Sequence, residues 1–304
     1  MVMQIISLST ARSCAFSSAF FAYIISYQDL FPIKNIARIR GEIGLKPEYR
    51  CIMEVNSNTK LNGECILRLF IESGLHPRFG NAFWPKAAVC VCLVTFFGGR
   101  KTLLLRQCSP HHHAEHGVIE YLRRVYHGRV FSVKIYCNYS PCSKPGFECC
   151  SRIFKMKEDL MRNFDERMGA YRFGDSFSFE FIFAQIYNIA RPSCWRRRCF
   201  LQMGPYVHSQ PEPNDRSVGI LCSFGPNMRS FQGADWEGLI DLLATWDMRC
   251  GISHVHICFP YLMSIRFGEY GNWRDIEDAK VRTDFEILKR NYSPSTCVSS
   301  YHIW

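Results

Sequence analysis

The sequence predicts an α/β fold of three layers, in which a mixed sheet of five strands is flanked by about six helices. Short runs in which apolar and polar residues alternate are typical of strands. Between these runs lie longer stretches whose apolar residues recur with the helical period. Because strands and helices take turns along the chain, each crossover between parallel strands needs a covering helix, and these helices form the outer layers.

Each expected element rests on such a pattern. Helices are expected over residues 66–75, 113–125, 153–161, 235–246, 261–270 and 275–290. Strands are expected over residues 87–97, 101–106, 130–135, 177–189 and 254–259. The first two strands form a hairpin, because Gly98 and Gly99 separate two apolar runs. A connection rich in Pro and Arg, residues 190–234, is far longer than most loops and indicates either function or disorder.

Length and composition favour one catalytic domain with an appendage. The chain has 304 residues, of which 47% are hydrophobic and 14% aromatic, which suffices for one substantial core and argues against disorder. We assign residues 62–290 to this domain, with residues 190–234 as a long inserted loop. Residues 1–61 are an N-terminal extension, whose part from residue 32 onward is interpreted as a loop or linker, and residues 291–304 are a C-terminal tail.

Two features bear on the cellular compartment. Residues 13–27 are apolar and follow Arg12, as in a signal peptide, but they are too short and too rich in Ser for a transmembrane helix; a core-packing helix is an alternative. Several of the 16 cysteines occupy predicted strands, where they behave as small buried hydrophobes: Cys90, Cys92, Cys137 and Cys258. We therefore expect a reducing compartment, cytoplasmic or nuclear, with secretion as the alternative and no membrane partner.

The motif with the clearest chemistry lies between residues 111 and 150. His113 and Glu115 open a predicted helix, and Cys142 follows Pro141 after a predicted strand. A second thiolate comes from Cys149 or Cys150, beyond a spacer of six or seven residues. One imidazole and two thiolates leave the fourth position of a zinc ion open for water, as catalytic zinc sites do. Zinc lowers the pKa of such a water enough to supply hydroxide near neutral pH.

A closed structural zinc site is the alternative interpretation. It would need a fourth ligand, and five residues lie near enough in sequence to be considered: His111, His112, His116, Cys137 and Cys150. Three features favour the catalytic site instead, namely the Glu two residues after the His, the Pro before the first Cys, and the strand followed by a helix. A Glu at this spacing is an acid/base rather than a ligand.

The segments HAE, NYSPC and the Cys-Cys pair resemble the AID/APOBEC cytidine deaminases over roughly residues 62–290, most closely the group of the fourth paralogue. This resemblance implies a cytidine-deaminase-like three-layer fold and a Zn²⁺ cofactor. It makes His113, Cys142 and Cys149 the zinc ligands and Glu115 the proton shuttle. Cys149 is preferred to Cys150 because Glu148 and Cys149 stand where the family has its second Cys.

The resemblance also implies a polynucleotide substrate. Tyr139 takes the place of the family's pocket Trp, and Tyr187 matches a pocket tyrosine, so both would stack near an extruded base. Five further residues are candidates for holding the flanking strand, since aromatics stack on bases and Arg pairs with phosphates; they are Trp84, Trp195, Arg196, Arg197 and Arg198. The net charge of +10 agrees with a polyanionic partner.

The expected function is therefore zinc-dependent hydrolytic deamination of cytosine to uracil in single-stranded DNA or RNA. The alternative is a zinc-fold protein that binds nucleic acid or regulates without efficient turnover. The long spacer between Cys142 and Cys149 motivates this alternative, because extra residues could displace the second thiolate and with it the open position of the metal.

Overall fold

A mixed sheet organises the computed structural model of this chain. The structure describes residues 49–53, 62–74, 87–109, 112–125, 130–168, 176–187, 191, 215–249, 255–268 and 271–291. The strands, in spatial order, are β1 (Tyr49–Met53), β3 (Lys101–Gln107), β2 (Val89–Phe96), β4 (Val130–Tyr139), β5 (Ser178–Gln185) and β6 (Met228–Ser230). β2 is antiparallel to both β3 and β4, whereas β4, β5 and β6 run parallel, as β1 and β3 do.

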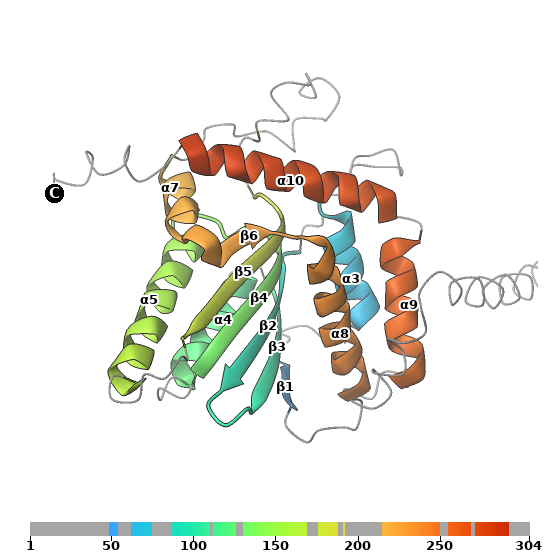
Figure 1. The fold of residues 1–304 in the computed structure, drawn as a ribbon, viewed down its shortest axis with the longest axis horizontal. Coiled ribbons are helices and arrows are strands. Elements are labelled where there is room, and N and C mark those ends of the chain that lie inside the picture. Colours follow the sequence, from blue (N-terminus) through green and yellow to red (C-terminus); the bar gives the residue numbers. More distant parts are fainter. Residues whose placement is uncertain are drawn as a thin grey trace, which may run out of the picture. The chain divides into compact units, whose positions relative to one another are not determined.

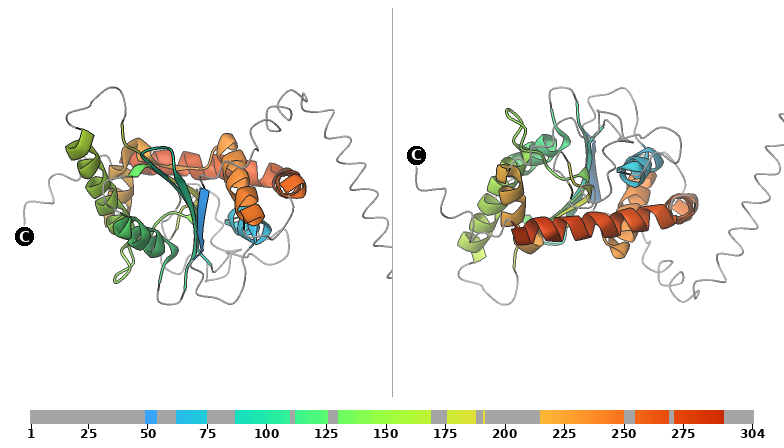
Figure 2. Two further views of the ribbon diagram at one scale, coloured as in Figure 1. Left: turned by 90° about the horizontal axis from the view of Figure 1, so that it is seen from below. Right: turned by 90° about the horizontal axis from the view of Figure 1, so that it is seen from above.

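Helices cover both faces of this sheet, as Figures 1 and 2 show. On one face lie α4 (Ala114–Arg124), α5 (Cys149–Met168) and α7 (Asp215–Ser223). On the other face lie α3 (Gly63–Glu72), α8 (Gly233–Arg249) and α9 (Val255–Phe267). The last helix, α10 (Gly271–Asn291), runs across one end of the sheet and adds Val281, Phe285 and Leu288 to the first core. The α/β class with three layers is thereby confirmed.

The central strands are buried on both faces, which explains their nearly continuous apolar sequences. On β2, Cys90, Cys92 and Val94 pack into the core beneath α4 and α5, whereas Val89 and Val91 pack into the core beneath α3 and α8. Burying both faces excludes water from the strands and stabilises the sheet by the hydrophobic effect. The sheet is therefore a rigid support for the loops at its ends.

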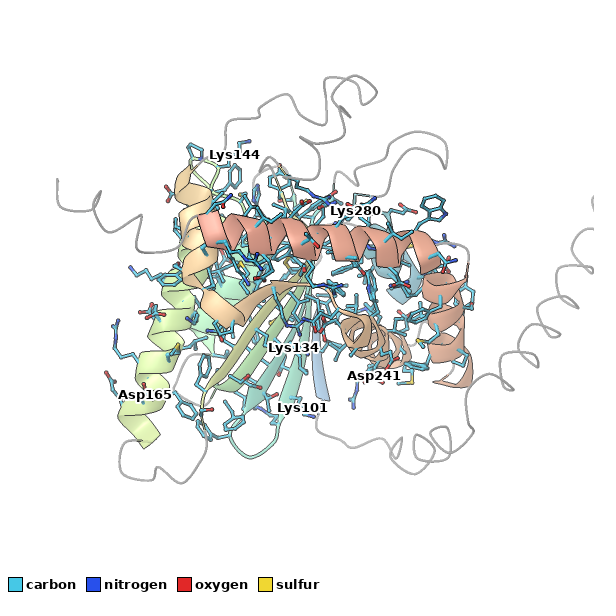
Figure 3. The ribbon with its side chains drawn as sticks, turned by 45° about the horizontal axis from the view of Figure 1, so that its top comes forward. Lys101, Lys134, Lys144, Asp165, Asp241 and Lys280 are labelled. Atoms are coloured by element: carbon cyan, nitrogen blue, oxygen red, sulfur yellow. A yellow bond between two sulfur atoms is a disulfide. The ribbon has the colours of Figure 1, made fainter. Side chains whose placement is uncertain are left out.

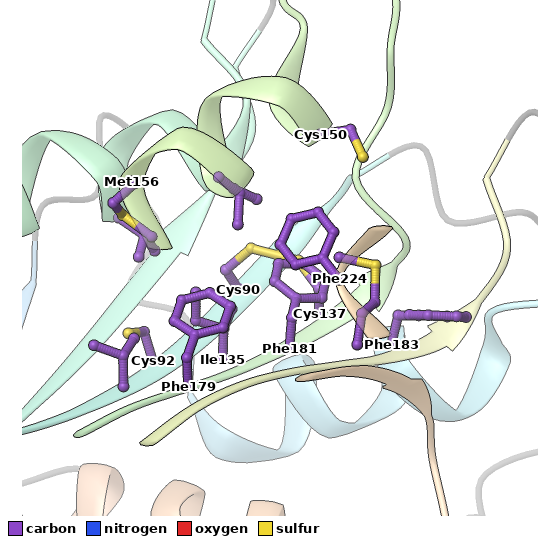
Figure 4. Packing of buried hydrophobic residues seen from close by; sticks show 14 of the residues in the cluster. Cys90, Cys92, Ile135, Cys137, Cys150, Met156, Phe179, Phe181, Phe183 and Phe224 are labelled. Carbon is purple, nitrogen blue, oxygen red and sulfur yellow. A yellow bond between two sulfur atoms is a disulfide. The ribbon is translucent and has the colours of Figure 1, made fainter. Parts of the chain in front are cut away.

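Two of the buried cysteines differ from the expectation. Cys90 and Cys137 are cross-strand neighbours on β2 and β4 and form a disulfide, surrounded by Phe179, Phe181 and Phe183 in Figure 4. Cys92 and Cys258 are buried free thiols, although Cys258 lies in α9 and not in a strand. Burial was thus predicted correctly for the cysteines, and the pairing of two of them was not.

The prediction of a strand over residues 254–259 is wrong, because α9 begins in this stretch. A short apolar run without period is compatible with a buried strand and with a buried helix, and its pattern alone does not separate them. The fifth strand of the central sheet is instead β6, which lies with α7 inside the long connection of residues 190–234. β1, from the stretch interpreted as a linker, adds a sixth strand beside β3.

None of the helices in the described ranges is long and apolar enough to cross a membrane. The apolar stretch of residues 13–27 lies outside the described residues, so its interpretation as a signal peptide stays a prediction.

Candidate metal centre

Three elements meet at one end of the sheet. His113 is the residue directly before α4, Cys142 follows the end of β4 by three residues, and Cys149 is the first residue of α5. β4 and β5 run parallel, so the carboxyl ends of both strands point to this place, where open α/β sheets commonly bind ligands. In Figure 3 the labelled Lys144, from the loop between Cys142 and Cys149, marks this end, and Lys101 marks the opposite end of the sheet.

The three donor atoms are spaced as a zinc ion requires. Nδ1 of His113 lies 3.1 Å from Sγ of Cys149 and 3.4 Å from Sγ of Cys142, and the two sulfurs are 3.7 Å apart. Zinc bonds of about 2.0–2.3 Å at tetrahedral angles would place an imidazole nitrogen about 3.5 Å from a sulfur and two sulfurs about 3.8 Å apart. The residues present therefore fit a metal held by one imidazole and two thiolates.

Glu115 lies beside these donors in the first turn of α4. Its side chain is 5% exposed, and its Oε2 has no hydrogen-bond partner within the described part of the chain. Burial, together with the nearby thiol of Cys142, raises the pKa of this carboxyl to about 7. A buried carboxylate oxygen without a partner is costly, and such groups are typical of functional sites.

The two thiols influence each other. The hydrogen bond to Cys149, aided by the backbone of Lys144 and by the His113 imidazole, lowers the pKa of Cys142, whereas the same bond and burial raise the pKa of Cys149. Because the thiolate is the form of cysteine that binds metals, the lowered pKa of Cys142 suits a metal ligand.

The histidines considered as fourth ligands have shorter contacts with other groups or lie outside the described residues. Nε2 of His112 is 3.0 Å from Oε1 of Glu120. Nε2 of His116 lies 3.6 Å from Sγ of Cys149, but it is 2.8 Å from the carbonyl oxygen of Phe147 and donates its proton there. His111 lies outside the described residues.

The remaining cysteines are engaged too. Cys137 is bonded to Cys90, and the side chain of Cys150 is buried in the core beneath α5. Among the described residues, the group that could hold a metal consists of His113, Cys142 and Cys149. The structure thus places Cys149, and not Cys150, with the other two donors.

The two candidate pocket tyrosines lie together beside this centre. Tyr139 ends β4 and is 6% exposed, whereas Tyr187 follows β5 and is 40% exposed. Their ring centroids are 5.6 Å apart with an interplanar angle of 59°. The backbone N–H of Tyr187 donates to Oγ of Ser140 at 2.9 Å, which joins the ends of the two strands. Burial, and after it the nearby thiol of Cys142, raise the pKa of Tyr187.

The other candidate substrate residues lie outside the described residues, so their roles stay predictions; they are Trp84, Trp195, Arg196, Arg197 and Arg198.

Sequence reasoning missed two residues that shape this end of the sheet. Phe147 stacks on the ring of His113, with centroids 4.0 Å apart. Asn138 is fully buried on β4; its Oδ1 accepts from the N–H of Val89 at 2.8 Å and its Nδ2 donates to the carbonyl of Ala87 at 3.1 Å. An Asn in an apolar strand is a signal that could have been used, whereas no pattern marks Phe147.

A scan against models of known protein families found no match, and a search of curated proteins found no significant match either.

Proposed function

We propose that this protein is a zinc-dependent deaminase of the AID/APOBEC type, which hydrolyses cytosine to uracil in single-stranded nucleic acid. One observation carries the proposal: three zinc-type donors converge beside a buried Glu115 oxygen that has no partner among the described residues. A purely structural metal site does not need such a carboxylate, because burying an oxygen without a hydrogen-bond partner destabilises the folded protein.

His113, Cys142 and Cys149 would hold the zinc. When bound, zinc supplies a water of lowered pKa in its fourth position, and hence a nucleophile at neutral pH. Glu115 would take a proton from this water through its free Oε2 and deliver it to the leaving amine. The reaction consumes one water and releases ammonia, so the same carboxyl group returns to its starting state.

Tyr139 and Tyr187 would receive the base. Their rings stand at an angle beside the donors and belong to two strands that hydrogen bonds tie together, so a pyrimidine could stack on them within reach of Glu115. The exposed edge of Tyr187 suits a nucleotide whose neighbours remain in solvent. The net charge of +10 supports a polyanionic strand as the carrier of that base.

The test is uracil formation on cytosine-containing single-stranded DNA and RNA by the purified zinc-loaded protein. We expect product on a single strand and little on a duplex, in which the base is stacked and paired. Binding of single strands without uracil formation on any cytosine substrate would instead support the alternative, a nucleic-acid-binding protein without turnover.

A further inference from the structure

We propose that Phe147 is a positioning residue that holds the His113 imidazole in its metal-binding orientation. The proposal rests on the metal centre of the proposed function and does not depend on deamination. Phe147 lies in the six-residue spacer between Cys142 and Cys149.

The spacer is an ordered turn. The N–H groups of Phe147 and Glu148 both donate to the carbonyl of Lys144, at 3.0 and 2.9 Å. Gly146 has φ +83°, a left-handed conformation that favours glycine. At the base of the turn, the N–H of Cys150 donates to the carbonyl of Cys142 at 2.9 Å. The spacer is therefore a closed turn that holds the two sulfurs 3.7 Å apart.

This turn places Phe147 flat on the metal-ligand imidazole. The rings of Phe147 and His113 are nearly parallel, at 14°, with centroids 4.0 Å apart. One turn further along α4, Nε2 of His116 donates to the carbonyl oxygen of Phe147 at 2.8 Å and fixes its backbone. The Phe147 ring thus covers one face of the half-buried His113 imidazole, while Nδ1 of His113 points at the two sulfurs.

The stacking geometry suits an imidazole that carries positive charge. Two neutral aromatic rings avoid a close face-to-face arrangement, because the negative faces of their π systems repel. An imidazole polarised by a bound cation is electron-poor, so the negative face of a phenyl ring attracts it. We therefore expect Phe147 to stabilise the metal-bound state of His113 relative to the metal-free state, in addition to restricting ring rotation.

Groups that orient a metal ligand change metal affinity by about 10- to 100-fold when they are removed. The experiment is a titration of the metal-free protein with Zn²⁺ against a competing chelator and with Co²⁺, whose visible absorption reports the ligand geometry. Phe147→Leu should weaken Zn²⁺ binding by about tenfold and alter the Co²⁺ spectrum. Phe147→Tyr, which keeps the ring, should bind like the wild type.

The matched control is Phe154→Leu. Phe154 lies on α5 near Cys149 but packs against Phe224, with centroids 5.2 Å apart, and not against a ligand. This variant should lose thermal stability and keep its metal affinity. Replacement of Phe147 by pentafluorophenylalanine, which preserves shape but reverses the charge distribution of the ring, should weaken binding as Phe147→Leu does.

Wild-type affinity in folded Phe147→Leu, or an equal loss in Phe154→Leu, would overturn the proposal, as would a wild type that binds no metal. If Phe147→Leu does not fold, the Co²⁺-loaded wild type decides: the ring protons of Phe147 should be strongly shifted by the paramagnetic ion, and unshifted signals overturn the assignment. Uracil formation is scored separately, so metal binding that depends on Phe147 without deamination rejects the proposed function alone.

Discussion

Two polar clusters lie near the carboxyl end of β5. They differ in whether their buried carboxylates have hydrogen-bond partners. In the α10 charge cluster, formed by Arg191, Glu277 and Asp284, Arg191 donates to Glu277 at 2.5 Å and to Asp284 at 2.7 Å. Gln185, the last residue of β5, also donates to Glu277, at 3.0 Å. In the metal centre, Oε2 of Glu115 is buried and has no partner among the described residues.

The difference indicates what each cluster does. The α10 charge cluster satisfies its buried charges internally, as a structural network must. The candidate metal centre holds three donor atoms within 4.8 Å of one another and has a buried Glu115 oxygen without a partner in the described part of the chain, as a site that binds a ligand would. Substitutions in the two clusters should therefore have different consequences, one on metal and activity and the other on stability.

The largest effect is expected for Cys142→Ala. It removes one of three ligands, so zinc retention and activity should be lost, and with them the stabilisation that metal binding gives, about 4 kcal/mol at a thousandfold excess over Kd. Zinc content and thermal unfolding with and without chelator measure this. In the control Cys150→Ala, the neighbouring thiol is lost from the core and zinc should remain; zinc retained by Cys142→Ala would contradict the assignment.

Arg191→Leu should lower stability without changing zinc binding. It removes the buried guanidinium that donates to both Glu277 and Asp284, which costs about 3–5 kcal/mol of unfolding free energy. Denaturant unfolding measures the loss, and zinc content should not change. Lys289→Leu, at an exposed ion pair with Glu286 on the same helix, should cost at most about 1 kcal/mol. Equal losses in the two variants would mean that the α10 charge cluster has no special structural role.

The smallest effect is expected at the rim of the metal centre. Tyr187→Ala should weaken single-strand binding by about 1–3 kcal/mol, because one stacking ring is lost, while Tyr187→Phe should bind normally. Fluorescence anisotropy with a labelled oligonucleotide measures both. An unchanged affinity for Tyr187→Ala would assign this side chain to ordinary solvent-exposed surface.

The sequence predicted the metal centre better than the α10 charge cluster, for a physical reason. The spacing of His113 and Glu115 on one helical turn, and the Pro before Cys142, are local features of the chain. Arg191 and Asp284 are 93 residues apart, and only tertiary packing brings them together. Phe147 shows the same limit on a smaller scale, because the course of a turn decides which side chain covers His113.

The fold shows a similar contrast. The strands from β2 to β5 carry long apolar patterns and were predicted close to their observed bounds. β6 has three residues, too few to show a period, and its place in the sheet depends on pairing with β5. The apolar pattern of the stretch that begins α9 is compatible with a strand and with a helix. Packing of this segment against α3 and α8 stabilises the helix.

The role of Glu115 is tested most directly by measuring zinc content and uracil formation on the same preparations of wild type and Glu115→Gln. We expect one zinc per chain in both proteins, and deamination in the wild type that falls by about 10⁴-fold in the variant, because one carboxylate serves both proton transfers. Loss of zinc from Glu115→Gln would make Glu115 a ligand and contradict this role, as would undiminished deamination by the zinc-loaded variant.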